Sequence, residues 1–288
     1  MSTHGATHTG RMKLSVAVAS AQAPPEAFVV FRGFDESIRT AAGLGYQGVE
    51  LALKTAADVD PDRLASWLDA SGLEVSCIST GQVFAGLGLY FTHPDADARA
   101  KTEKVFTDLI VLASGFGKMV NVGRARGFVG EGQSRDEAEV LFLDVARRLC
   151  DVAGPLGVTL VIEPVNRYEI NFVNSLDEGA ALVRQVERPN IGLMPDVFHM
   201  NIEDARIGEA LVRHADLVRY VHLADSNRLA PGHGHLDFDE IFNALRTARY
   251  SGWVSIEIFP KPDADTAARQ AAEAILPRIE AYNAEAGP

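Results

Sequence analysis

Short apolar runs alternate with longer amphipathic stretches along most of this chain. The run 158–162 (Val-Thr-Leu-Val-Ile) is β-branched or leucine throughout and carries no charge, which is typical of a strand buried on both faces. Stretches such as 61–71 place apolar residues at helical spacing, with a proline in the first turn. Strands are predicted at 13–20, 48–53, 74–80, 118–123, 158–164, 191–197, 217–225 and 253–259. Helices are predicted at 34–44, 61–71, 94–114, 136–153, 175–186, 207–214, 238–248 and 266–284.

Eight strand–helix units of about 30 residues follow one another without a polar linker, and such alternation implies parallel strands. A chain of 288 residues accommodates this most simply as a (β/α)8 TIM barrel of the α/β class. We expect a single catalytic domain, 12–288, after a flexible N-terminal tail, 1–11. The competing fold is a doubly wound open sheet, whose glycine fingerprint is missing from the segment AQAPPEAF after the first strand.

Composition narrows the classes of partner. The net charge of −12 argues against a general nucleic-acid role, which needs a basic surface. No run approaches the ~18 apolar residues of a membrane span, so no membrane partner is expected. The two cysteines have no metal-type spacing, and we expect a reduced, cytoplasmic protein. The stretch RMKLSVAVASAQA resembles a short secretory leader, but its apolar run is short and we favour a first strand there.

Four consecutive predicted strands, the fifth to the eighth, each end on a potential metal ligand. Glu163, Asp196, His222 and Glu257 lie 33, 26 and 35 residues apart, one strand–helix unit each. Because a barrel brings the carboxyl ends of its strands to one mouth, these side chains are predicted to meet there. Three carboxylates and one imidazole suit a hard or borderline divalent ion such as Mn²⁺, Mg²⁺ or Co²⁺. Individually, the aspartate could cap a helix and the histidine could be a core residue, but four ligands in phase favour a shared metal site.

The same region carries a family resemblance. The segments IEPVNRYE, MPDVFHMNIED, VHLADSNR and SIEIF resemble motifs of the xylose isomerase-like (sugar phosphate isomerase/epimerase) barrels, above all the ketose 3-epimerases of the tagatose/psicose type. The resemblance implies one divalent ion on the four strand-end residues, with Mn²⁺ expected first. It implies that Glu163 and Glu257 act as acid and base. It also implies that Glu169, His199 and Arg228 bind the sugar near its carbonyl end.

The chemistry agrees with these roles. Inverting C3 of a ketose or keto-sugar acid requires a stabilised cis-enediolate and a base on each of its faces, which two glutamates provide. A single base moving a proton between C1 and C2 would give an aldose–ketose or hydroxypyruvate-type isomerase instead. An endonuclease of the apurinic-site type on the same barrel would need further histidines on early strands, where Glu50 and Thr80 stand. A non-catalytic metal-binding barrel would not need the sugar-binding residues.

Two departures from the ketose 3-epimerase motifs bear on the substrate. The eighth strand ends in IEIFP, where those enzymes tend to have Glu-Pro-Phe. The loop after the fourth strand contains Arg124 and Arg126, which could clamp a carboxylate or phosphate, as in a branch acting on keto-sugar acids, or form surface salt bridges.

Other features have two open interpretations. An aromatic group in the loop after the third strand could wall off the far end of a substrate or merely pack: Phe84, Tyr90 and Phe91. Segment 231–235 (Pro-Gly-His-Gly-His) could form a closing loop. Glu50 could line the barrel mouth or be the buried partner of an arginine. We expect a homo-oligomer, either a dimer or a tetramer.

Overall fold

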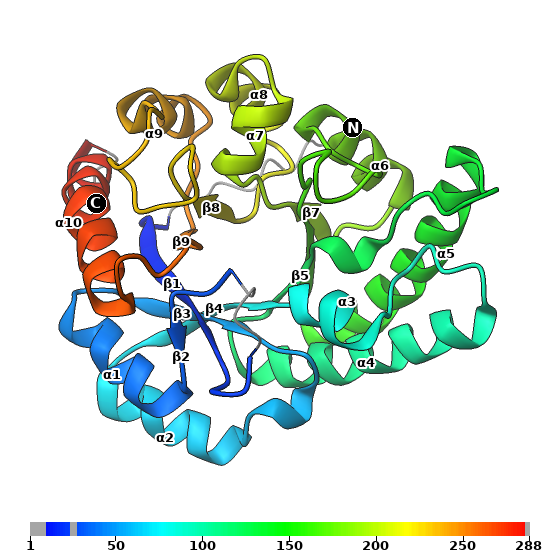
Figure 1. Ribbon diagram of the computed structural model, residues 1–288, viewed down its shortest axis with the longest axis horizontal. Helices are drawn as coiled ribbons and strands as arrows, with labels where there is room; N and C mark the ends of the chain where they lie inside the picture. The colour runs from blue at the N-terminus through cyan, green and yellow to red at the C-terminus, as the bar shows by residue number, and fades with distance from the viewer. Residues whose placement is uncertain (1–9, 24–27, 286–288) are drawn as a thin grey trace.

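The computed structural model describes residues 10–23 and 28–285, in which parallel strands form a closed ring surrounded by helices (Figure 1). The strands are β1 Lys13–Ala19, β2 Phe31–Arg32, β3 Gly48–Ala52, β4 Glu74–Ser79, β5 Met119–Val122, β6 Thr159–Ile162, β7 Ile191–Leu193, β8 Val221–Leu223 and β9 Trp253–Ile256. The helices are α1 Phe34–Gly43, α2 Pro61–Ser71, α3 Gly81–Leu87, α4 Ala96–Gly115, α5 Arg135–Ala153, α6 Leu176–Val186, α7 Val197–Glu203, α8 Ile207–Arg213, α9 Phe238–Thr247 and α10 Ala264–Glu285.

The strand order is β7-β6-β5-β4-β3-β1-β9-β8, with the short β2 added beside β1. Between β7 and β8 the ring is joined only by single parallel bridges, Leu193 with Val218 and Asp196 with His222. Backbone hydrogen bonds accompany the bridges, including one of 2.9 Å from the amide of His222 to the carbonyl of Pro195. The predicted (β/α)8 barrel is therefore confirmed, and β6 to β9 are its fifth to eighth barrel strands.

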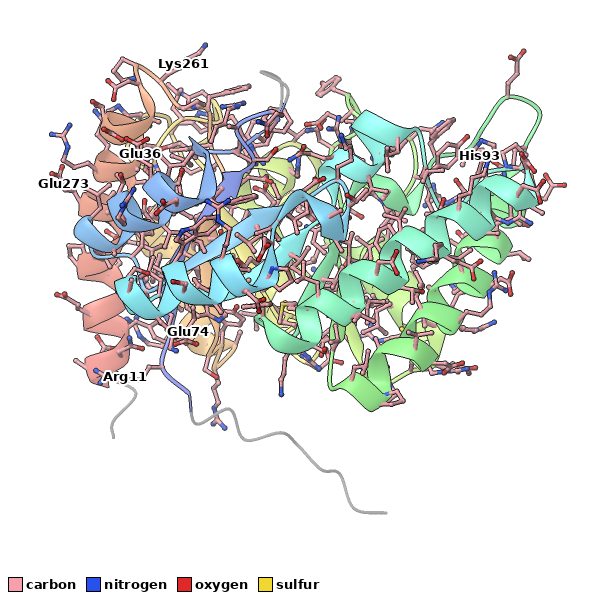
Figure 2. The ribbon with its side chains drawn as sticks, turned by 90° about the horizontal axis from the view of Figure 1, so that it is seen from below. Arg11, Glu36, Glu74, His93, Lys261 and Glu273 are labelled. Carbon is pink, nitrogen blue, oxygen red and sulfur yellow. The ribbon has the colours of Figure 1, made fainter. Side chains whose placement is uncertain are left out.

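A side view separates the two ends of the barrel (Figure 2). Arg11, just before β1, and Glu74, the first residue of β4, lie in the lower part of this view, whereas Lys261, which follows β9, lies at the top. All pairings in the sheet are parallel, so the carboxyl ends of the strands meet at the upper mouth. This shared direction is the condition for a site built from several strand ends.

Helix starts follow their capping residues. The Asp60 carboxylate accepts the amides of Asp62 and Arg63 at 3.0 Å, satisfying groups that a helix terminus leaves unpaired. Ser175 accepts the amide of Glu178 at 3.2 Å, as the Ser-x-x-Glu pattern predicts. Together with the apolar faces of the helices, these caps fix where each helix packs on the barrel.

Several short elements were not predicted. β2 has two residues, while α3 and α7 have seven each, too short for a periodic pattern to reveal them. The segment 11–23 that resembled a leader supplies β1, and the predicted tail 1–11 lies outside the described residues except for its last two positions. No helix among the described residues has the length and apolar character that crossing a membrane requires.

Arg126, one of the two loop arginines, is fully buried and ties neighbouring strand ends together. Its Nε donates to the carbonyl of Phe172 at 2.9 Å, and Nη2 donates to that of Val173 at 2.8 Å. Nη1 donates to the carbonyls of Gly123 and Glu163, both at 3.0 Å. Burial lowers the pKa of the guanidinium to about 10, opposed by the neighbouring carboxylates. The side chain therefore clamps the ends of β5 and β6 to the loop beyond β6.

Replacing this clamp should destabilise the barrel. Arg126→Met keeps an apolar stem but leaves the buried carbonyls of Phe172 and Glu163 without a donor, and each unpaired carbonyl costs about 1–3 kcal/mol. The carbonyls of Gly123 and Val173 lose one donor each but keep a backbone amide. We expect the free energy of unfolding, measured by urea denaturation, to fall by at least about 2 kcal/mol. The control Arg39→Met removes an exposed side chain from α1 and should change it by less than about 0.5 kcal/mol. Equal effects of the two substitutions would contradict the structural role.

Candidate metal centre

The four predicted ligands converge at the carboxyl mouth of the barrel. Glu163 directly follows β6, Asp196 comes after β7, His222 lies within β8 and Glu257 directly follows β9. One ligand atom from each lies within 4.8 Å of the others. His222 Nδ1 is 3.1 Å from Glu163 Oε1, 3.8 Å from Asp196 Oδ2 and 3.6 Å from Glu257 Oε2. The convergence expected from strand periodicity is thus present in the structure.

This cluster fits a divalent ion. Its donor set is three carboxylates and one imidazole, and the histidine turns a ring nitrogen toward all three acids. Hard and borderline divalent ions favour such oxygen-rich sets. Four protein ligands also leave coordination positions for oxygens of a substrate. Among residues 10–23 and 28–285, no other group of three or more acidic, histidine or cysteine side chains is gathered this tightly.

Burial and neighbouring charges shift the pKa values of the two glutamates in opposite directions. Burial favours the neutral form of Glu163, but the hydrogen bond and charge of His222 outweigh it and hold the glutamate's pKa below its ordinary value. Burial raises the pKa of Glu257 to about 8, partly opposed by the charges of His222 and Arg228. Burial lowers the pKa of His222, yet the surrounding carboxylates raise it well above its ordinary value. Two carboxylates with separated proton affinities are typical of acid–base pairs.

Asp196 serves two elements at once. Its Oδ1 accepts the amide of Phe198 at 2.9 Å and so caps α7. Its Oδ2 belongs to the cluster and accepts a hydrogen bond from Nη1 of Arg228. The helix-capping and metal-ligand interpretations of this residue are therefore compatible. Because α7 begins at the site, the cap also brings the helix residue His199 to the cluster.

Arg228 reaches the cluster from the loop after β8. Its backbone is left-handed, with φ of 62°, and its guanidinium donates to Asp196 and to Glu257. The guanidinium carbon lies 5.2 Å from the ring of Phe28 and 4.8 Å from that of Phe198. These rings and carboxyl groups hold the guanidinium in a buried position beside the cluster.

The loop that carries Arg228 is organised by a buried carboxylate, that of Asp225. It accepts the backbone amides of Ser226 at 2.7 Å, Gly232 at 2.8 Å and Leu236 at 3.1 Å. A Cβ at Gly234 would lie only 2.1 Å from Asp225 Oδ1, so the loop packs against the carboxylate without room for a side chain. The Pro-Gly-His-Gly-His segment is thus folded around Asp225 in this structure.

Two further expected sugar contacts lie beside the cluster. His199 is buried, and its Nε2 is 3.9 Å from Asp196 Oδ2; burial lowers its pKa, opposed by Asp196. Asn166 Nδ2 donates to His199 Nδ1 at 2.8 Å and to Glu169 Oε1 at 3.1 Å. No role was predicted for Asn166, although its place three residues after the strand-end glutamate is a usable signal. It connects the two expected contacts to each other.

A cavity of about 430 Å³ opens onto these groups. Its lining includes five charged or titratable residues: Arg124, Glu163, Glu169, His199 and Glu257. It also includes five apolar residues: Phe28, Val29, Ala52, Ala85 and Val165. Such a combination suits a small ligand with polar reacting atoms and a carbon skeleton to be covered.

The two loop arginines have different positions relative to the cavity. Arg124 lines the cavity, with Nη1 3.9 Å from Glu169 Oε2 and its guanidinium carbon 5.8 Å from the ring of Phe84. Arg126 does not reach the cavity, because its donors are used on backbone carbonyls. A clamp made of both arginines is therefore not formed. Three loop aromatics were expected as a possible far wall of the substrate site: Phe84, Tyr90 and Phe91. None of them lines the cavity, and Phe91 is fully buried in the core.

Glu50 takes neither of the two positions considered from the sequence. It is fully buried in β3 and contacts His222 on the side of the ring that faces away from the cluster. Its partner lies 172 residues away, so no local pattern could have indicated the contact.

Comparison with known proteins agrees with this geometry. A protein-family model described as xylose isomerase-like TIM barrel matches residues 38–278. An L-ribulose 3-epimerase of Mesorhizobium japonicum is 33% identical over 218 residues, covering 75% of this chain and 72% of that protein. A D-psicose 3-epimerase of Agrobacterium fabrum is 41% identical over 113 residues, 39% of each chain.

Solved structures show the same likeness over nearly the whole barrel. A structure of L-ribulose 3-epimerase superposes with a TM-score of 0.81 at 26% identity, covering 96% of this chain and 97% of that one. A D-allulose 3-epimerase from Methylomonas sp., in complex with D-allulose, gives 0.79 at 26% identity, with 93% and 98% covered. The chain therefore belongs to the xylose isomerase-like TIM barrel family, and its homologues are sugar epimerases.

Proposed function

We propose that this protein is a divalent-metal-dependent ketose 3-epimerase. The observation that carries the proposal is that Glu163 and Glu257 belong to one tight ligand cluster and also line the same cavity. Relatives named for epimerisation at C3 of L-ribulose and D-psicose support the reaction type. Mn²⁺ is our first choice of ion, with Mg²⁺ or Co²⁺ as alternatives, and we keep the expectation of a cytoplasmic homo-oligomer, dimer or tetramer.

The roles follow from position. A divalent ion held by the four ligands would supply electrostatic stabilisation of the negative charge that develops on the substrate's oxygens. One of the two glutamates removes the proton from C3, and the other returns a proton to the opposite face of the enediolate. The substrate leaves with inverted C3 and no net change in protons or electrons. His199, which lines the cavity, donates to a substrate oxygen, and Glu169 accepts from a hydroxyl. Arg228, the third expected sugar contact, does not line the cavity and donates to Asp196 and Glu257, so it acts on the substrate through these two carboxylates.

A neutral ketose is the favoured substrate over a keto-sugar acid. Of the two loop arginines only Arg124 lines the cavity, and Glu169 stands 3.9 Å from it. A substrate carboxylate would compete with that carboxylate for a single guanidinium. Hydroxyl groups of a neutral sugar can instead accept from Arg124 while donating to Glu169.

Removing either proton carrier should slow turnover strongly. Glu163→Gln and Glu257→Gln keep the side-chain shape but cannot exchange a proton, and we expect kcat for a ketose to fall by about 10²–10⁴-fold. Rates are measured with Mn²⁺ present, together with the metal content of each variant. Glu273→Gln, at an exposed position on α10 (Figure 2), is the matched control and should keep the original rate. Near-normal turnover by both site variants would exclude this mechanism.

Isotope exchange distinguishes epimerisation from isomerisation. The Mn²⁺-loaded protein is incubated in D₂O with L-ribulose, D-psicose, D-fructose, D-tagatose, a keto-sugar acid and hydroxypyruvate, and NMR follows deuterium at each carbon. We expect exchange at C3 that stops after chelation with EDTA. Exchange confined to C1 would replace the proposal with an aldose–ketose or hydroxypyruvate-type isomerase. No exchange with any compound, in protein shown to hold metal, would contradict both.

Arg124 provides a test of substrate charge. Because it lies on the cavity wall outside the ligand cluster, Arg124→Leu should raise KM for a neutral ketose about 10-fold with a smaller change in kcat, as for loss of uniform binding. Arg39→Leu, exposed on α1, is the control. A KM increase restricted to keto-sugar acids, with neutral ketoses unaffected, would reverse the assignment of substrate charge.

A further inference from the structure

The carboxylate of Glu50 lies in the barrel interior, on the far side of His222 from the metal cluster. Its side chain has no exposed surface, so leaving it without partners would cost several kcal/mol. Glu50 Oε1 and Oε2 lie 3.0 and 2.9 Å from His222 Nε2. Oε2 also accepts the hydroxyl of Tyr220 at 2.9 Å. The carboxylate is therefore fully engaged, and none of its contacts is with the other three ligands.

Tyr220 is held both by hydrogen bonds of its hydroxyl group and by packing of its ring. Its hydroxyl is 3.0 Å from Ser15 Oγ and 2.7 Å from Ser76 Oγ, both buried. The Tyr220 ring packs edge-to-face on that of His222, with 5.7 Å between their centroids. These contacts come from β1, from β4 and from the residue directly before β8, so strands around the barrel hold the position of Glu50.

The two nitrogens of His222 consequently face different groups. Nε2 faces Glu50, while Nδ1 faces Glu163, Asp196 and Glu257. A neutral imidazole has one N–H and one lone pair, and the hydrogen bond made by one nitrogen determines which nitrogen can bind a metal. We infer that Glu50 is a positioning residue that holds the Nε2–H tautomer and the ring orientation of His222, presenting Nδ1 to the divalent ion.

This inference rests on the metal-dependent function proposed above, but it predicts something separate. If Glu50 only fills the barrel interior, its replacement should lower stability and leave metal affinity unchanged. If it positions His222, metal affinity should fall, since loss of an outer partner of a ligand typically weakens binding about 10- to 100-fold. The two roles therefore differ in a measurement that does not depend on turnover.

The test compares Mn²⁺ dissociation constants of purified full-length variants by isothermal titration calorimetry. Glu50→Gln keeps the size of the side chain but removes its charge and one acceptor, and we expect binding about 10- to 100-fold weaker. Glu50→Asp keeps the charge but shortens the side chain by one methylene, and it should also weaken binding because contact with Nε2 is lost. Glu273→Gln controls for loss of a carboxylate and should bind as the original protein does.

A second measurement reads the hydrogen bond between His222 Nε2 and Glu50. With diamagnetic Zn²⁺ bound, ¹H–¹⁵N correlation spectra should show the Nε2–H proton of His222 shifted downfield by its hydrogen bond to a carboxylate, and Glu50→Gln should move that resonance upfield. Unfolding midpoints without metal show whether each variant is folded. If a folded Glu50→Gln protein binds Mn²⁺ as tightly as the original and keeps the Nε2–H resonance of His222 at the same position, the positioning role is overturned and the proposed function stands. If the original protein binds no divalent ion, both are overturned.

Discussion

Burial of negative charge at one end of the barrel is the constraint on which the rest of the site depends. Four carboxylates gather there almost without exposure: Glu50, Glu163, Asp196 and Glu257. Uncompensated, such charges would be far too costly to bury. His222 stands between them and Arg228 closes the set from the loop above. The left-handed backbone of Arg228, and the loop folded around Asp225, are consequences of bringing that one cation into place.

The strand-end ligands could be predicted because their convergence does not depend on detail. Parallel strands bring their carboxyl ends to one mouth whatever the exact strand lengths, so Glu163 and Glu257 are brought together even though β7 and β8 are shorter than expected. Family motifs covering the second half of the barrel then supplied roles for the residues around them. The fold itself followed from the repeated alternation of apolar runs and helical spacing.

The roles of the loop arginines and of Glu50 could not be obtained this way. Arg124 and Arg126 share a residue type and a loop, but one lines the cavity and the other turns inward to backbone carbonyls. Because every residue has a backbone carbonyl, the sequence does not indicate which carbonyls an arginine will bind. Glu50 meets His222 across the interior, and that contact depends on which face of β3 and of β8 points inward.

The way in which the barrel closes gives the ligand cluster a role in stability as well as in chemistry. β7 and β8 are joined by single bridges rather than a ladder, and one of those bridges pairs Asp196 with His222. Two of the four ligands thus stand on opposite sides of the junction between β7 and β8, which no continuous ladder closes. An ion bound by both residues would connect the ends of β7 and β8 across this junction. Metal binding would then be coupled to closure of the barrel, because an ion that binds only the closed form stabilises the folded state by mass action.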